Sequence, residues 1–111
     1  MKFSKLLYLF IALLSSYASA DVPGQDVYGK VVETVYQQNL DPAEFEFTLV
    51  GYGHACGGTI FRVRSNAVEI ADRKFSLVTA ALVSGKTIAF RETGVCISGG
   101  RMEVSWVKLV K

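Results

Sequence analysis

Residues 44–50, with the sequence Glu-Phe-Glu-Phe-Thr-Leu-Val, place an apolar side chain at every second position. This alternation predicts a β-strand that packs one face on a hydrophobic core and turns the other to water. Antiparallel sheets commonly have one solvated face, so the pattern favours a mainly β protein. We expect Glu44 and Glu46 on the wet face, as surface charges rather than as an acid–base pair.

Four further segments carry the same signals on either side of this strand. Each is short, rich in β-branched or aromatic residues, and bounded by glycine, proline or polar turns. The alternation places Phe61 and Val63 on one dry face, and Ile88 and Phe90 on another. The predicted strands are residues 29–37, 59–64, 86–92 and 103–110.

Between the third and fourth strands the period changes to that of a helix, over residues 72–84. The apolar stripe is wide, which predicts burial against the sheet; it comprises Phe75, Leu77, Val78, Ala81, Leu82 and Val83. Two start signals compete: Asp72 as N-cap, or a capping box formed by Asn66 and Glu69. Gly85 is well placed as the left-handed residue that ends the helix.

The predicted order is therefore β-β-β-α-β-β, mainly β with one helix. Five short strands with a helix between the third and the fourth is the order of an OB-fold, a small Greek-key barrel. In such a barrel the helix is expected to cover one end.

The first twenty residues predict export. Lys2 and Lys5 precede an apolar run over residues 6–14, and Ala-Ser-Ala at 18–20 is a cleavage site for a signal peptide. The run is too short to span a bilayer, and no second run of spanning length follows. We expect residues 21–28 to form a flexible mature N-terminus and residues 29–111 to form the barrel domain, in the periplasm or outside the cell.

The signal peptide also carries the excess charge. The whole chain has twelve basic and ten acidic residues, and removal of Lys2 and Lys5 leaves a formal net charge of zero. A neutral exported protein is not expected to bind nucleic acid through a basic surface. The partners predicted are a glycan or another protein, with no membrane span.

The two cysteines, Cys56 and Cys96, predict one disulfide in an oxidising compartment. A bridge would remove Cys56 as a nucleophile beside His54, and we predict no catalytic site. His54 has no ligand partner at metal spacing, so we expect it to be solvated or bonded to backbone. No cofactor or metal is predicted.

The candidate binding residues are basic and aromatic. Arg62 and Arg64 share one strand face, and Arg91 on the next strand is expected to extend them into a basic stripe. Tyr36 and Tyr52 are expected near that stripe, on the face that OB-folds use for oligosaccharides and oligonucleotides. His54 is a further candidate binding residue. Surface charges that serve solubility are the alternative. Trp106, between apolar neighbours, is expected in the core or at a subunit interface.

In strand order, and in three stretches, the chain resembles the pentamer-forming B subunits of bacterial AB-type toxins, of the subtilase-cytotoxin and pertussis-like kind. The stretches are Gly-Lys-Val-Val-Glu-Thr at 29–34, Glu-Phe-Thr-Leu-Val-Gly at 46–51 and Ala-Leu-Val-Ser-Gly-Lys-Thr-Ile-Ala-Phe at 81–90. The chain departs from the family at Gly29, where the glycan pocket uses a serine, and at Thr48, where the family has a cysteine.

The resemblance implies a non-catalytic, glycan-binding subunit that assembles into a homopentamer and carries an enzymatic partner. A stand-alone relative of the family fits the departures at Gly29 and Thr48 equally well. The rival hypothesis from another class is a monomeric periplasmic inhibitor or envelope-stress protein that acts on one protein partner.

Overall fold

The structure of the chain is a computed structural model that describes residues 21–37 and 41–111. The predicted signal peptide, residues 1–20, lies outside these ranges and stays a prediction. No helix within them is both long enough and apolar enough to cross a membrane.

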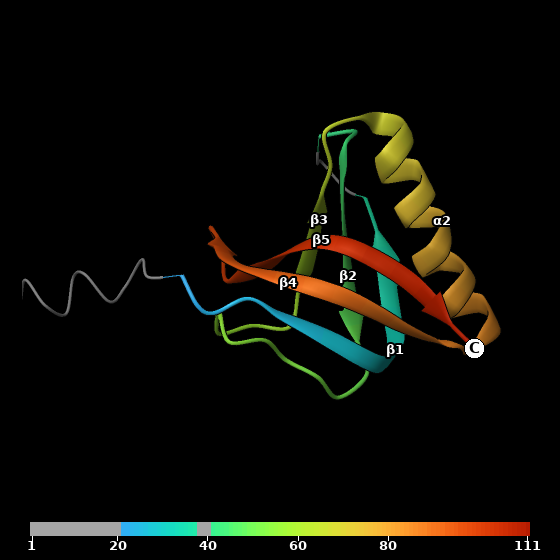
Figure 1. The fold of residues 1–111 in the computed structure, drawn as a ribbon, viewed down its shortest axis with the longest axis horizontal. Coiled ribbons are helices and arrows are strands. Elements are labelled where there is room, and N and C mark those ends of the chain that lie inside the picture. Colours follow the sequence, from blue (N-terminus) through green and yellow to red (C-terminus); the bar gives the residue numbers. More distant parts are fainter. Residues whose placement is uncertain (1–20, 38–40) are drawn as a thin grey trace, which may run out of the picture.

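In the described part of the chain, five strands and one helix follow one another in the predicted order (Figure 1). They close into a barrel with neighbours in the order β1-β2-β3-β5-β4, in which β3 and β5 run parallel and the other pairs antiparallel. This is the Greek-key order of an OB-fold, so the predicted fold class is confirmed. The elements are β1 (Gln25–Tyr36), β2 (Glu44–Leu49), β3 (Phe61–Arg64), α2 (Val68–Ser84), β4 (Thr87–Ile97) and β5 (Arg101–Val110).

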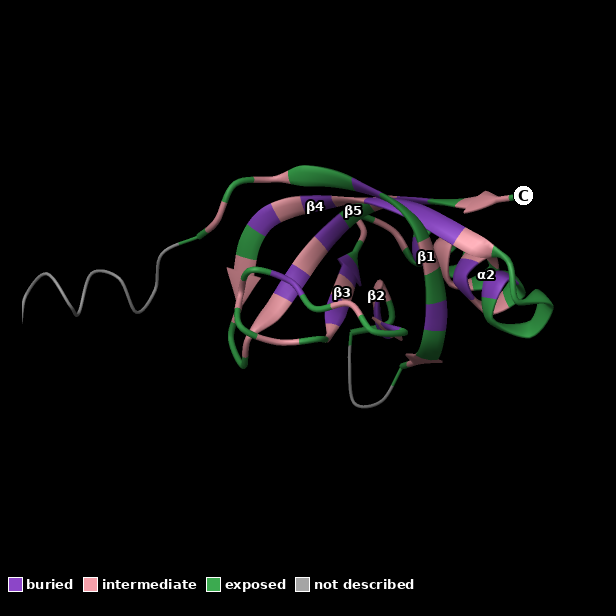
Figure 2. Cartoon of the chain, turned by 90° about the horizontal axis from the view of Figure 1, so that it is seen from below, coloured by how far each residue is buried: buried purple, intermediate pink, exposed green. Residues whose placement is uncertain are grey.

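The barrel interior is filled by phenylalanine rings that the alternating patterns placed inward. Phe47 stacks on Phe61 with ring centroids 5.2 Å apart, and both rings meet Phe90 edge-on. Along β3, and along β5 as far as Val104, buried residues alternate with more exposed ones as predicted, whereas β2 and β4 each bury three consecutive residues (Figure 2). Aromatic contacts of this kind contribute beyond the area they bury.

Three strands, β1, β4 and β5, are longer than predicted; β5 begins at Arg101 rather than at residue 103. β1 begins at Gln25 rather than at residue 29, because Gln25 and Val27 pair with Glu92 and Phe90 of β4. Most of the segment predicted as a flexible N-terminus is therefore paired backbone or lies beside it, and the Val22 N–H donates to the carbonyl of Gly94. β4 runs on to Ile97, so Cys96 lies in a strand rather than in a loop.

The helix α2 begins at Val68, four residues before the predicted start at Asp72. Its N-cap is Ala67, and no side chain caps it, so neither start signal works through a capping bond. The extra turn is favoured because it buries Ala71. The C-terminal prediction is confirmed: Gly85 has φ 70°, a left-handed conformation that costs a glycine little.

α2 covers one end of the barrel, where Val78 and Ala81 are buried and the Phe75 ring meets Phe45 edge-on at 5.3 Å. The predicted apolar stripe is wider than the face that the barrel covers. Leu82 is partly exposed and Val83 is 82% exposed, which contradicts their predicted burial.

The predicted disulfide is confirmed. Cys56 and Cys96 are bonded, with Cα atoms 5.5 Å apart, and they join the loop between β2 and β3 to the end of β4. Because the bridge closes a 40-residue separation, it restricts the unfolded chain strongly.

Candidate functional site

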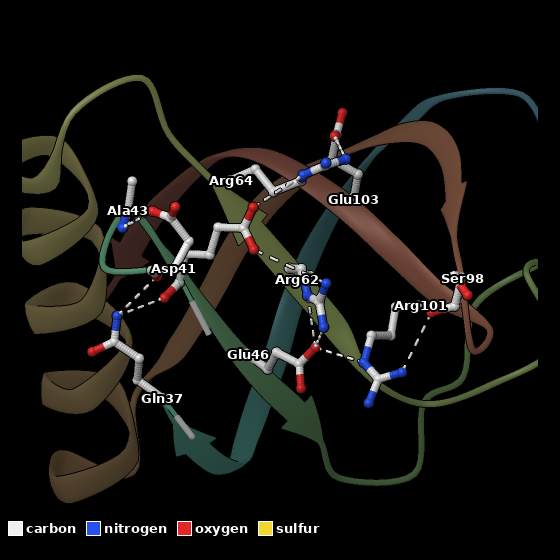
Figure 3. A network of polar contacts seen from close by, with 10 residues as sticks. Gln37, Asp41, Ala43, Glu46, Arg62, Arg64, Ser98, Arg101 and Glu103 are labelled. Carbon is white, nitrogen blue, oxygen red and sulfur yellow. Dashed lines mark hydrogen bonds and ion pairs between the residues drawn. The ribbon is translucent and has the colours of Figure 1, made fainter. Parts of the chain in front are cut away.

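The most organised group of polar side chains lies on the outer surface of β2, β3 and β5 (Figure 3). The strand register brings opposite charges together, since Glu46 faces Arg62 and Glu44 faces Arg64 across the β2–β3 pair. Cross-strand pairs of this kind stabilise a sheet. We call this surface the polar face; it comprises Tyr36, Glu44, Glu46, Arg62, Arg64, Arg101 and Glu103.

Glu46 is the centre of the polar face. Arg62 donates to its Oε2 from Nε at 2.8 Å and from Nη2 at 2.7 Å, and Arg101 donates from Nε at 2.6 Å. The residue is only 2% exposed, which contradicts its predicted place on a wet surface. Its side chain does leave the barrel, but the two guanidinium groups cover it.

The titration of Glu46 follows from these contacts. Burial by itself would raise the pKa of Glu46, but hydrogen bonds from Tyr36, Arg62 and Arg101 and the charge of Arg62 hold it below its usual value. The pKa of Tyr36 is raised, first by burial and then by its hydrogen bond to Glu46. The carboxylate is therefore ionised over the neutral pH range and is not prepared to act as a general acid.

The network continues toward solvent. Arg64 Nη1 lies 3.0 Å from Glu103 and its Nε lies 3.4 Å from Glu44. Three carboxylates and three guanidinium groups thus cancel, and the polar face carries no formal net charge. Arg62 and Arg64 lie together as predicted, but they do not form a basic stripe, because glutamates neutralise both.

A second polar group lies at the barrel end beneath the β2–β3 loop. Glu92 is 1% exposed, and it accepts hydrogen bonds from Gln25 Nε2 at 3.0 Å and from the Tyr52 hydroxyl at 3.3 Å. Lys30 lies over the Tyr52 ring, 4.5 Å from its centroid. Within residues 21–37 and 41–111, Glu92 makes no ion pair. Burial, and then the charge of Glu92, raise the pKa of Tyr52.

His54 is a structural residue at the same end. Its Nε2 donates to the Ile60 carbonyl at 2.8 Å, its Nδ1 accepts the Cys56 N–H at 3.2 Å, and its ring meets Phe61 edge-on. This confirms the expectation of backbone bonding. Both bonds require the neutral Nε2–H tautomer, and burial lowers the pKa of His54.

The five predicted binding residues therefore lie in three places. Arg62 and Arg64 are on the polar face, and Tyr52 and His54 are at the barrel end. Arg91 is on β4, where it pairs with Asp26 at 3.1 Å.

Sequence reasoning missed the partners that organise these places. The alternation predicts Glu46 on the wet face, and Arg101 lies outside the predicted strands, between residues 86–92 and 103–110. The facing of Glu46 and Arg62 follows from simple hairpin pairing of β2 and β3 and was available as a signal. The approach of Arg101 was not, because it depends on the parallel pairing of β3 with β5.

The structure also places Gly29, Thr48 and Trp106, which the sequence analysis singled out. Gly29 has φ 68°, and the Thr48 hydroxyl lies 2.6 Å from that of Thr34 on the outer surface. Trp106 is half-buried and lies outside the core cluster. In the described part of the chain, no three His, Cys, Asp or Glu side chains gather as they would around a metal ion.

No family model matches the chain, and no curated protein matches it.

Proposed function

We propose that this chain is an exported, non-catalytic binding module that recognises a glycan or a protein through its polar face. The observation that supports the proposal is the fixed arrangement around Glu46. Two arginines are held in place by one buried carboxylate, so their remaining N–H groups are oriented before any ligand arrives. A preorganised surface loses less entropy on binding.

The chemistry of the polar face favours a glycan as the first ligand to test. Sugar hydroxyls both donate and accept hydrogen bonds, and the face offers guanidinium donors beside carboxylate acceptors without net charge. The Tyr36 ring and the hydroxyl pair of Thr34 and Thr48 adjoin it on β1 and β2. The outer surface of strands 2 and 3 is also where OB-folds bind oligosaccharides.

A glycan array followed by calorimetry tests this proposal. Arg64 is half-exposed, so Arg64→Ala removes a ligand contact with little effect on folding. We expect a loss of affinity of about tenfold or more, since a hydrogen bond to a charged group contributes about 1.5–3 kcal/mol. The matched control is Arg91→Ala, which removes an equally exposed arginine from β4.

Equal losses in Arg64→Ala and Arg91→Ala would contradict the polar face as the binding site. No binding to any glycan would favour the protein ligand, and with it the rival hypothesis of a monomeric inhibitor. The part of the proposal that concerns export rests on the predicted signal peptide and agrees with the Cys56–Cys96 disulfide. N-terminal sequencing of the exported protein should begin at Asp21.

The resemblance to toxin B subunits adds the hypotheses of a homopentamer and of an enzymatic partner. Mass determination in solution tests the first, and co-purification from the source tests the second.

A further inference from the structure

The first turns of α2 carry the exposed charges Glu69, Asp72 and Arg73, but from Phe75 onward its outer face lacks the charges that a solvent-exposed helix usually carries. From Phe75 to Gly85 the sequence contains no charged residue, although much of this stretch is exposed. Globular proteins normally turn charged or polar residues outward on such a helix. We call this surface the outer helix face; it comprises Ser76, Thr79, Ala80 and Val83. This face leaves two apolar side chains, Ala80 and Val83, exposed to water.

The shape of the outer helix face fits a copy of itself. Val83 stands out from the helix, 82% exposed. Val83 also forms one edge of a shallow hollow that extends over the two preceding turns of the helix, where Phe75, Ser76, Thr79 and Ala80 line it. A projecting side chain and a hollow on one face are self-complementary when two copies are related by a twofold axis.

We propose that two copies of this chain associate through α2, with the two helices antiparallel and crossing near Thr79 and Ala80. In that arrangement Val83 of each copy enters the hollow beside Ser76 of the other. The small side chains of Ser76 and Ala80 allow the helices to approach closely, as ridges pack into grooves.

Charge at the two ends of the helix supports the antiparallel choice. Counting outward from the crossing, Asp72 near the start of one helix lies opposite Lys86 just after the end of the other. Both residues are exposed, and neither forms an ion pair in the described part of the chain. The arrangement also places the opposite ends of the two helix dipoles together.

A ring of parallel helices would lack the pairing of Asp72 with Lys86. Equivalent residues would then lie at equal heights, so Asp72 would meet no lysine and Val83 would lie level with Val83. A single helix face is also smaller than a standard interface of roughly 800 Å² per partner. We therefore expect a weak dimer that dissociates on dilution.

Sedimentation over a concentration series tests the association. The wild-type protein should pass from monomer to dimer, and Val83→Glu should remain monomeric with an unchanged melting temperature, because the side chain is exposed. Val50→Glu is the matched control, an exposed valine away from α2 that should still dimerise. A wild-type protein that stays monomeric at every concentration, or forms a pentamer, overturns the proposal.

Crosslinking tests the direction of the helices. Ser76→Cys and Val83→Cys proteins are mixed and treated with a short bismaleimide, which leaves the native disulfide intact. The antiparallel pair predicts more of the mixed product, in which the two different variants are joined, than of the product that joins two copies of the Val83→Cys variant. The reverse result overturns the antiparallel arrangement.

Charge exchange and glycan binding complete the test. Asp72→Lys should weaken the dimer, and adding Lys86→Asp should restore it. Failure of the double variant to regain the dimer would contradict the pairing of these two residues. Glycan binding by the polar face should be unchanged in Val83→Glu, so the two proposals can fail separately.

Discussion

Two glutamates of the barrel, Glu46 on β2 and Glu92 on β4, are almost equally removed from water, yet they are stabilised in different ways. Glu46 accepts hydrogen bonds from two guanidinium groups. Glu92 accepts them from the neutral side chains of Gln25 and Tyr52. Glu46 lies outside the barrel beneath its partners, whereas Glu92 lies at the barrel end beneath a loop held by a disulfide.

The comparison shows two routes by which a small barrel keeps a carboxylate out of water. On the outer surface, strand register supplies arginines, and the charges cancel within the polar face. At the barrel end, the donors to Glu92 from the described residues are the neutral side chains of Gln25 and Tyr52, so the position of Glu92 depends on the few groups that contact it. Loss of a partner should therefore have different consequences at the two sites.

The largest loss of stability is expected from Glu46→Ala. This change leaves the guanidinium groups of Arg62 and Arg101 close together without a carboxylate between them. Removing one member of a buried ion pair costs about 3–5 kcal/mol, and because both arginines are partly exposed we expect about 2–4 kcal/mol. Urea unfolding measures the loss.

The control for Glu46→Ala is Glu103→Ala, whose partner Arg64 is half-exposed. Exposed pairs contribute about 0–1 kcal/mol, so this variant should unfold close to the wild type. Similar losses of unfolding free energy in the two variants would show that the burial of Glu46 does not determine the cost of removing its carboxylate.

A smaller effect is expected from Tyr52→Phe. The change keeps the ring on Phe61 and removes one of the two donors to Glu92. A buried acceptor that loses a partner costs about 1–3 kcal/mol. Tyr28→Phe, at an exposed tyrosine, is the control, and urea unfolding again gives the difference. A loss no larger than that of the control would indicate that water replaces the hydroxyl at Glu92.

The smallest effect on stability is expected from a change of pH, which acts through His54 at the same end of the barrel as Glu92. Because burial lowers the pKa of folded His54 below 6.5, the unfolded chain takes up a proton more readily. Stability is thus retained above about pH 6.5 and falls as the pH decreases toward the folded pKa. Melting temperatures between about pH 7.5 and pH 5 should decrease more steeply in the wild type than in His54→Gln. Parallel slopes for the wild type and His54→Gln between about pH 7.5 and pH 5 would contradict the role of His54.

Glu46 contributes to the pH dependence separately. Its lowered pKa confers stability that is lost only below about pH 4.5.

The core was predictable residue by residue, because inward positions follow from local alternation. Phe45, Phe47 and Leu49 are buried where the pattern placed them, and so are Phe61 and Phe90. The disulfide was predictable from the count of two cysteines and an oxidising compartment. The candidate site was predictable only in part: Arg62 and Arg64 lie on one face, but Arg91 is elsewhere.

The errors share a cause, which is that they involve residues brought together by distant strands. β1 extends to Gln25 because β4, far later in the sequence, offers it a partner. The helix begins early because the end of the barrel that α2 covers buries Ala71, and the barrel leaves Val83 uncovered.

By itself the sequence determined the order of strands and helix, the inward phenylalanines and the disulfide partners, because these depend on local periodicity and residue type. Only the tertiary structure decided that Glu46 is buried and that Glu92 has neutral partners. It also decided that glutamates neutralise Arg62 and Arg64, which therefore do not form a basic stripe. Barrel closure set these outcomes, since it fixes which side chains of neighbouring strands lie next to one another.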